Sequence, residues 1–129
     1  MSSVSQHEIL KAIERAQDAL LNAEYNLNGD FLLATANRAY YTCYYCMTAL
    51  LYCKNVFAKT HQGLRSKFTE LFIKTGIFPE KISDTITLLF DYRQEADYDL
   101  DAEISLDEAK ELIKKASEFL QLTTELLNQ

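Results

Sequence analysis

Arg93 and Tyr98, separated by four residues near the end of a predicted helix, are the pair of side chains best suited to chemistry in this chain. A guanidinium group can stabilise the negative charge of a phosphate, and a phenol can donate a proton or position a hydroxyl group. A phenol titrates near ~10 and an imidazole near ~6.5, so tyrosine is a poor general base at neutral pH. The pair therefore indicates a site at which acid–base catalysis would be weak.

The helical geometry separates these two residues. Five residues of helix correspond to a rotation of about 500°, which places Arg93 and Tyr98 about 140° apart on the helix surface. The two side chains would meet only if the helix ends between them, or if a twofold-related copy brings two such pairs together. In the alternative interpretation, Arg93 pairs with an acid such as Glu95 or Asp97, and Tyr98 packs against the last helix.

A second arginine, Arg38, lies in the tyrosine-rich segment 37–41, which reads Asn-Arg-Ala-Tyr-Tyr. Arg38 could hold a phosphate while the neighbouring rings stack on bases. Alternatively, it neutralises one of the nineteen acidic residues, with its stem lying along the helix surface. A single arginine does not decide between the two.

His61 lies in the segment 59–63, Lys-Thr-His-Gln-Gly, where a further helix is predicted to begin. A histidine beside a helix N-terminus can act as a base or bind an anion, and Thr60 can cap the helix. In the alternative interpretation, the imidazole only ties down the loop. The candidate catalytic pair is thus Arg93 and Tyr98, and the candidate nucleotide- or RNA-binding residues are Arg38, Lys59, His61 and Asp97.

The charge of the chain limits which partners it can bind. A formal net charge of -6 and a pI of about 4.9 argue against broad, nonspecific nucleic-acid binding, which needs a basic face. A small basic site within an acidic surface remains compatible with these values. The 129 residues are 48% hydrophobic and 25% charged, which predicts one globular domain over residues 1–129.

No metal, cofactor or membrane segment is predicted. Cys43, Cys46 and Cys53 share one apolar stretch, and we expect them to be small buried side chains in a reducing compartment. Residues 97–108 have the oxygen spacing of a calcium loop, but alanine replaces the glycine of its sharp turn, and this interpretation stays open.

The longest uncharged run, residues 39–53, is too short to span a bilayer. Since there is also no secretory signal, we expect a cytoplasmic protein.

Apolar residues recur at helical spacing through most of the chain. We expect a first helix that begins with a capping box of Ser5 and Glu8 and ends at Asn28-Gly29, and a second at about 31–55 that Asp30 caps. Three more are expected. The third covers about 63–75 and ends at Gly76, the fourth runs from Pro79, in its first turn, to the Arg93 segment, and the fifth runs from a second capping box, Ser105 and Glu108, to Leu127. The second helix is apolar nearly all round, which is typical of a central or subunit-contacting helix. The pattern predicts an all-α, antiparallel up-and-down bundle of about five helices.

Four segments together resemble the HEPN superfamily (higher eukaryotes and prokaryotes nucleotide-binding). They are residues 37–41, Lys-Thr-His-Gln-Gly-Leu at 59–64, Phe-Ile-Lys-Thr-Gly at 72–76, and Arg-Gln-Glu-Ala-Asp-Tyr at 93–98. The likeness extends from about Glu8 to Leu126 and is greatest for a branch of small, stand-alone prokaryotic members. It implies a helical bundle that forms a homodimer.

The resemblance also implies a function. Many members are endoribonucleases in which an Arg-x4–6-His motif meets its symmetry mate between subunits, while others bind RNA or nucleotides without cutting. Small members often form a toxin–antitoxin pair with a minimal nucleotidyltransferase, which can modify a tyrosine shortly after the motif histidine. Arg93 matches the motif arginine, but Tyr98 replaces the histidine, and Leu100 stands where the modified tyrosine would be.

We therefore expect a dimeric HEPN-like protein that binds RNA or a nucleotide in the groove between subunits, together with a nucleotidyltransferase partner. If it cuts RNA, Arg93 would stabilise the phosphate charge, and Tyr98 would position the attacking 2'-hydroxyl or donate a proton. The alternative is a non-enzymatic helical dimer whose acidic rim and tyrosines bind a protein. A cleft lined by Arg38, Arg93 and Lys59 would favour the RNA- or nucleotide-binding dimer. Placement of these three charges far from one another would favour the protein-binding dimer.

Overall fold

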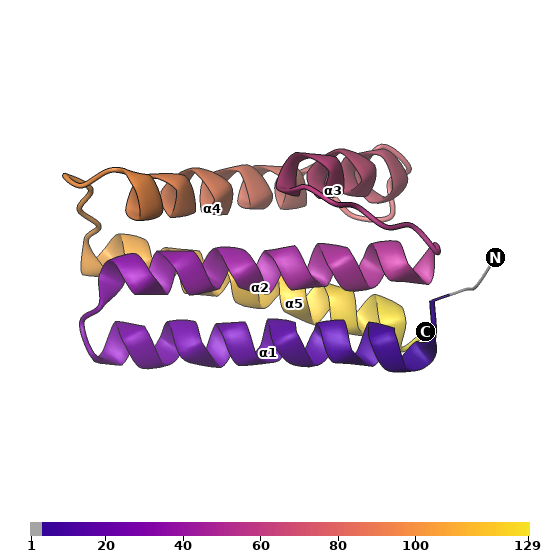
Figure 1. Cartoon of the computed structure of the whole chain (residues 1–129), viewed down its shortest axis with the longest axis horizontal. Helices are drawn as coiled ribbons and strands as arrows, with labels where there is room; N and C mark the ends of the chain where they lie inside the picture. Colours follow the sequence, from indigo (N-terminus) through magenta and orange to yellow (C-terminus); the bar gives the residue numbers. More distant parts are fainter. Residues whose placement is uncertain (1–3) are drawn as a thin grey trace.

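The computed structural model describes residues 4–129 as a bundle of helices. In chain order the elements are α1 (Gln6–Asn28), α2 (Leu32–Cys53), α3 (His61–Phe68), the π-helical turn η1 (Thr69–Ile73), α4 (Glu80–Tyr98) and α5 (Leu106–Leu127). The consecutive long helices α1, α2, α4 and α5 alternate in direction, and α2 lies between α1 and the layer formed by α3 and α4 (Figure 1). The predicted all-α, up-and-down bundle is confirmed.

Two capping boxes fix the starts of the outer helices α1 and α5. The hydroxyls of Ser5 and Ser105 accept hydrogen bonds from the backbone N–H groups of Glu8 and Glu108, at 3.2 and 3.1 Å. The glutamate carboxylates accept in return from the backbone N–H groups of the two serines. Both predicted boxes are confirmed. Glu108 also accepts a hydrogen bond from the Tyr92 hydroxyl, which ties the start of α5 to α4.

Three predicted helix boundaries were wrong. Asp30 does not cap α2, because it adopts a left-handed conformation (φ 64°) one residue before the N-cap, Phe31. Helix α2 ends at Cys53 rather than near Asn55, which is also left-handed (φ 58°). The third helix begins at His61 rather than at about Gly63, and the predicted cap by Thr60 is confirmed, since its hydroxyl accepts from the Gly63 N–H at 2.9 Å.

The helix predicted over residues 63–75 also changes its geometry part-way. It continues from α3 into η1, where the N–H of Lys74 bonds to the carbonyl of Thr69 at 2.9 Å, five residues back. Phe68 and Phe72 stack here with ring centroids 5.4 Å apart, and Phe68 also meets Phe119 of α5 edge to face at 5.5 Å. These contacts anchor α3 and so fix the position of His61 at its start.

Helix α2 is the centre of the bundle, as its composition predicts. It packs against α1, α5, α4 and α3, and it buries the largest share of the core, including Tyr40, Met47 and Leu50. Cys43 and Cys46 are buried, whereas Cys53 is exposed at the helix end, so the expectation of three buried thiols is wrong for Cys53. Over residues 4–129, no helix combines the length and hydropathy needed to cross a membrane.

Candidate functional site

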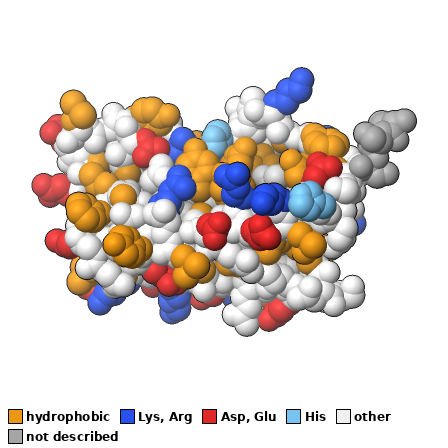
Figure 2. Space-filling model, turned by 60° about the horizontal axis from the view of Figure 1, so that its bottom comes forward, with side chains coloured by type: hydrophobic (Ala, Val, Ile, Leu, Met, Phe, Trp, Pro, Cys, Tyr) orange, Lys and Arg blue, Asp and Glu red, His pale blue; other side chains and the backbone are white. Residues whose placement is uncertain are grey.

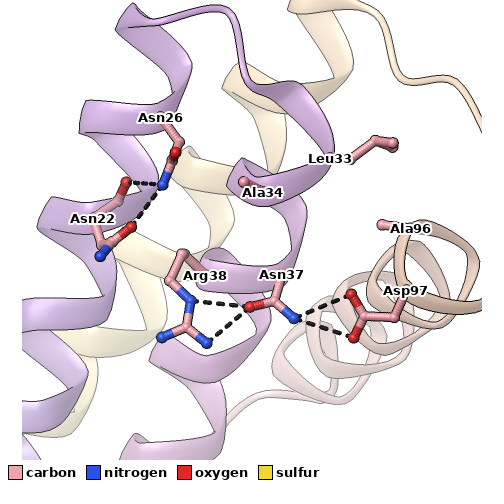
Figure 3. A pocket seen from close by; sticks show the side chains of 8 residues that line it. All are labelled: Asn22, Asn26, Leu33, Ala34, Asn37, Arg38, Ala96 and Asp97. Atoms are coloured by element: carbon pink, nitrogen blue, oxygen red, sulfur yellow. Dashed lines mark hydrogen bonds between the residues drawn. The ribbon is translucent and has the colours of Figure 1, made fainter.

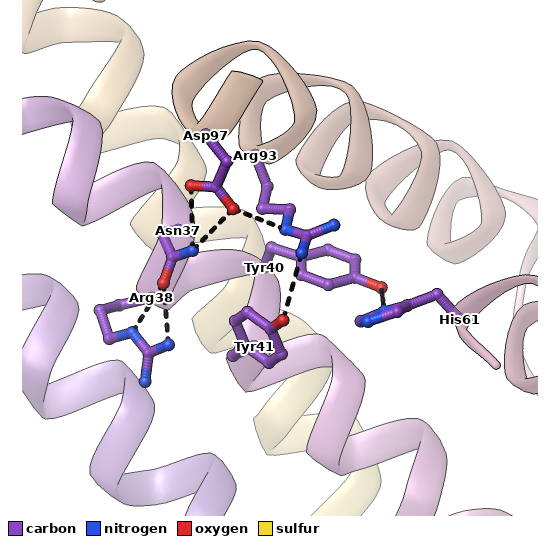
Figure 4. A network of polar contacts seen from close by, with 7 residues as sticks. All are labelled: Asn37, Arg38, Tyr40, Tyr41, His61, Arg93 and Asp97. Atoms are coloured by element: carbon purple, nitrogen blue, oxygen red, sulfur yellow. Dashed lines mark hydrogen bonds and ion pairs between the residues drawn. The ribbon is translucent and has the colours of Figure 1, made fainter. Parts of the chain in front are cut away.

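The side chain of Arg93 reaches from α4 into a group of aromatic rings on α2. Its guanidinium carbon lies 5.4 Å from the ring centroid of Tyr40 and 5.6 Å from that of Tyr41, and its Nη2 donates to the Tyr41 hydroxyl at 3.3 Å. Only 11% of the Arg93 side chain is exposed. The cation is therefore held against aromatic faces in a partly desolvated position, where such contacts are worth more than at an exposed site (Figure 4).

Asp97 supplies the counter-charge one helical turn later. Its Oδ2 lies 2.9 Å from Arg93 Nε, but the Nε–H bond does not point along this line, so the contact is an ion pair rather than a directed hydrogen bond. Both carboxylate oxygens also accept from the side-chain amide of Asn37 on α2, at 3.2 and 3.1 Å. Asp97 thus joins α4 to α2.

Arg38 enters the same network through Asn37. Its Nε and Nη2 donate to Asn37 Oδ1 at 2.9 and 2.8 Å, and its guanidinium carbon lies 5.0 Å from the Tyr41 ring centroid. Among the described residues, Arg38 makes no direct ion pair, so the alternative in which it neutralises an acid is wrong; the neutral side chain of Asn37 stands between Arg38 and Asp97. The network holds two guanidinium groups and one carboxylate, which leaves one positive charge uncompensated within it (Figure 4).

His61 approaches the network from the start of α3. Its Nδ1 and the Tyr40 hydroxyl form a hydrogen bond of 2.7 Å, and its ring centroid lies 5.0 Å from that of Tyr44. Burial, and then the charge of Arg93, lowers the pKa of His61 below its ordinary value, so the imidazole is neutral at neutral pH. Burial raises the pKa of Tyr40 well above its ordinary value, so its phenol stays protonated.

Tyr98 lies at the rim of this network. Helix α4 continues to Tyr98, so the prediction that Arg93 and Tyr98 meet only if the helix ends between them, or through a second copy, is wrong. The Arg93 guanidinium carbon nevertheless lies 5.8 Å from the Tyr98 ring centroid, because two long side chains span the angle between their positions. Tyr98 is 71% exposed, so it does not pack against α5 as the alternative required.

The structure brings together most of the residues singled out from the sequence. Arg93, Asp97, Arg38 and His61 lie in one network, and Tyr98 borders it. Lys59 is exposed in the loop before α3 and makes none of these contacts, so it does not join the two arginines.

Sequence reasoning gave no role to Asn37, and it considered Tyr40 and Tyr41 only as rings on which bases could stack, not as contacts of Arg93 and His61. The available signal was helical spacing, because Asn37, Tyr41 and Tyr44 follow one another at intervals of four and three residues on one face of α2. No cluster of three or more histidine, cysteine, aspartate or glutamate side chains suited to a metal ion occurs in the described part of the chain.

This arrangement can hold an anion beside aromatic surfaces. Guanidinium groups form paired, charge-assisted hydrogen bonds with phosphate oxygens, and tyrosine rings can stack on bases. Phenols as a class are poor proton acceptors at physiological pH, because they ionise only near ~10. His61 is less available for proton transfer, because its Nδ1 is already bonded to the Tyr40 hydroxyl. The chemistry of the site is thus that of phosphate and base recognition more than of proton transfer.

The comparisons with known proteins agree with the fold. The sequence pattern of the HEPN domain matches residues 9–127. A protein of Methanocaldococcus jannaschii named "Putative toxin" is 37% identical over 120 residues, covering 93% of this chain and 82% of that protein. A second protein of that organism with the same designation is 30% identical over 122 residues, covering 95% and 90%. A UPF0332 protein of Thermotoga maritima is 30% identical over 113 residues, covering 88% and 86%. With nearly its whole length matched, the chain belongs to the HEPN domain family.

Proposed function

We propose that this protein binds RNA at the Arg93 network and acts as the toxin-type component of a toxin–antitoxin pair. The observation that carries the proposal is a network with two guanidinium groups and one carboxylate, beside exposed and half-buried tyrosine rings: Arg93 pairs directly with Asp97, and Arg38 is linked to it only through Asn37. The uncompensated positive charge attracts a phosphate, and the rings of Tyr41 and Tyr98 offer surfaces for bases. The names of the two archaeal relatives support the toxin role.

The acidic character of the chain makes this binding local. With a net charge of -6, the protein as a whole repels a polyanion, so only an RNA that reaches the network gains favourable contacts. We expect few phosphate contacts and a shallow dependence of affinity on salt concentration. A protein that binds nucleic acid along a broad basic face would show a much steeper dependence.

We expect this site to cleave RNA weakly or not at all. Tyr98 stands where HEPN ribonucleases carry histidine, and a phenol is a poor base at neutral pH. His61 is the nearest imidazole, but its Nδ1 is occupied by the Tyr40 hydroxyl. Residual cutting would use Arg93 to stabilise the phosphate charge and Tyr98 to position the 2'-hydroxyl or donate a proton.

The proposal includes two protein partners, a second copy of the chain and a nucleotidyltransferase. The family likeness supports both partners, because the small HEPN proteins that this chain resembles often form dimers and pair with a nucleotidyltransferase. Light scattering at micromolar concentration should give the mass of a dimer, and a monomer would contradict this part. Copurification from cells that express both proteins should recover the nucleotidyltransferase with this chain.

The decisive test is RNA binding by fluorescence anisotropy with a labelled single-stranded oligoribonucleotide. Arg93→Ala should weaken binding at least about tenfold, because hydrogen bonds to charged groups contribute about 1.5–3 kcal/mol each. Arg15→Ala is the matched control, since it removes the same charge from an exposed position of α1 outside the network. Equal affinities for the wild type and Arg93→Ala would refute the assigned site.

A second candidate function, docking of a protein partner, is favoured by one surface. Large apolar side chains are exposed at the end of the bundle where α1 joins α2 and α4 joins α5; they include Tyr25 (81%), Phe31 (66%) and Leu100 (103%). Figure 2 shows hydrophobic side chains gathered toward one end of the face in view. This candidate would be favoured if the wild-type protein binds no RNA but captures a protein partner, and if Phe31→Ser weakens that capture.

A further inference from the structure

An open apolar groove lies at the end of the bundle where α1 joins α2 and α4 joins α5, which is the left end in Figure 1. Its volume is about 520 Å³, and its apolar lining includes Phe31 and Leu33 at the start of α2 and Ile104 of the connection between α4 and α5. Leu100, in the same connection, is fully exposed. Since monomeric proteins rarely group large apolar side chains in water, this end has the composition of a contact surface.

The same end of the bundle is acidic and carries no cation. Its two segments, residues 22–34 and 94–109, contain nine of the nineteen acidic residues and none of the thirteen lysines and arginines. All nine acidic residues are exposed, and Asp97 is the one of them that forms an ion pair within residues 4–129. Figure 2 shows acidic side chains beside hydrophobic ones at the left edge of the molecule. This end therefore carries more negative charge than the whole chain, whose net charge is -6.

A polar hollow separates the groove from the Arg93 network. This hollow has a volume of about 430 Å³; it shares Leu33 and Ala34 with the groove and continues to Asn37 and Arg38 (Figure 3). Arg38 is the first cation along α2 from this end. A positively charged occupant of the groove is attracted by the acidic residues and repelled at Arg38, so the contact surface ends before the network.

The charge of this end decides which class of molecule it can bind. RNA and an anionic membrane surface carry the same sign and are repelled. Two copies of the chain that met through this end would place its acidic residues against one another, which is also unfavourable. A segment of another protein that combines large apolar side chains with lysine or arginine gains in both respects. Its apolar side chains leave water in the groove, and its cations meet a polar rim of opposite charge, as in many protein interfaces.

We propose that this end of the bundle docks a basic, apolar segment of another protein. The apolar side chains of the segment fill the groove against Phe31, Leu33 and Ile104, and its cations pair with exposed acids of the connection such as Asp101 and Glu103. The inference assigns the chemistry of the partner that the second candidate function leaves open. It does not depend on RNA binding at the Arg93 network.

The test begins with a phage-displayed library of random short peptides, selected on the immobilised wild-type protein. The enriched peptides should combine lysine or arginine with large apolar residues, and one of them, synthesised with a fluorescent label, becomes the probe for anisotropy. Phe31→Ser and, separately, Leu100→Ser should each weaken its binding at least about tenfold, as expected for apolar side chains central to an interface. Serine is a favourable N-cap residue, so Phe31→Ser should preserve the start of α2.

Phe57→Ser is the matched control for the apolar contact. Phe57 is also a largely exposed phenylalanine (59%, against 66% for Phe31), and it lies in the loop after α2, at the other end of that helix. This variant should bind the peptide as the wild type does. Thermal unfolding followed by circular dichroism confirms that each variant is folded.

A second pair of variants tests the charge of the rim. Asp101→Asn combined with Glu103→Gln should weaken peptide binding and make it less dependent on salt concentration, because two attractive charges are lost. Glu80→Gln combined with Asp84→Asn removes the same charge from exposed positions at the start of α4 and should change the affinity little.

The outcomes separate this inference from the proposed function. No enrichment, enriched peptides without basic residues, or binding that survives both Phe31→Ser and Leu100→Ser overturns the docking surface. A wild-type dimer that both variants convert to a monomer in light scattering overturns it too, because a second copy then occupies this end. Arg93→Ala should leave peptide binding intact, so a failure of RNA binding refutes the proposed function and not this inference.

Discussion

If the proposed site is right, replacing Tyr98 by histidine should give this protein a ribonuclease activity well above that of the wild type. The substitution puts an imidazole at the rim of the Arg93 network, where the structure places the Tyr98 ring 5.8 Å from the guanidinium carbon. A neutral imidazole can remove the proton of a 2'-hydroxyl whose neighbouring phosphate is bound by Arg93. The wild-type phenol does this poorly, because phenols as a class are protonated at neutral pH.

The expected gain follows from the exposure and charge of the position. The charge of Arg93 lowers the pKa of an introduced imidazole and the neighbouring charge of Asp97 raises it, so the two effects largely cancel and leave that pKa at about 6–6.5. At a pH of about 7.5 nearly all of it would be the free base. General-base catalysis contributes about 10²–10⁴-fold, and because Tyr98 is 71% exposed we expect the lower end, about 10²-fold.

The assay is cleavage of an oligoribonucleotide that carries a fluorophore and a quencher. The rate of Tyr98→His should rise with pH through about 6–6.5 and then level off. Adding Arg93→Ala should remove the gain. Tyr25→His is the matched control, since Tyr25 is also a largely exposed tyrosine (81%, against 71% for Tyr98) and lies on α1, remote in sequence from the network. A folded Tyr98→His protein that binds RNA but cleaves no faster than the wild type would refute a shared site for positions 93 and 98.

Four further predictions address the site and the fold. Arg93→Ala should raise the pKa of His61 in an NMR titration, because the guanidinium charge lowers it; an unchanged pKa would contradict the contact. Since the pKa of His61 is lowered in the folded state, the free energy of unfolding should fall as pH drops below ~6.5, and less so in His61→Asn. Gly76→Ala should lower the free energy of unfolding in urea by about 1 kcal/mol, because φ is 79° there, while Gly76→Asn should lower it less. Ser105→Ala should cost about 1 kcal/mol through loss of the cap, whereas the mid-helix control Ser117→Ala should have little effect.

Local signals were sufficient to predict the fold of this chain. The two capping boxes mark the starts of α1 and α5, and both form as their spacing indicates. Gly76, in the left-handed conformation, lies between the third and fourth helices as expected, whereas Pro79, expected in the first turn of α4, is its N-cap. Each of these signals depends on residues within four positions of one another. The predictions that were wrong concerned the helix ends at Asp30 and Asn55. These ends depend on the left-handed backbone conformation of single residues, which the composition of the segment does not determine.

The site was only partly predictable, because its contacts join distant segments. Tyr40 and His61 are 21 residues apart, and Asn37 and Asp97 are 60 apart. Their pairing depends on how α3 and α4 lie on α2. The position of α3 is set by the stacking of Phe68 on Phe72 and by the edge-to-face contact of Phe68 with Phe119, rather than by any feature of His61 itself. Helical spacing indicated which residues share a face but not which face of another helix they meet.

A network of two arginines and one carboxylate explains how an acidic protein can keep a cationic site. A partly buried guanidinium without any partner would pay a large desolvation cost, and Asp97 reduces that cost for Arg93 at 2.9 Å. A second carboxylate in place of Asn37 would neutralise the network and leave nothing to attract a phosphate. Asn37 instead extends the influence of Asp97 to Arg38 without adding charge, because its amide donates to the carboxylate and its oxygen accepts from the guanidinium. Asn37→Asp should therefore weaken RNA binding while the fold survives, a result that a purely structural role for the network does not predict.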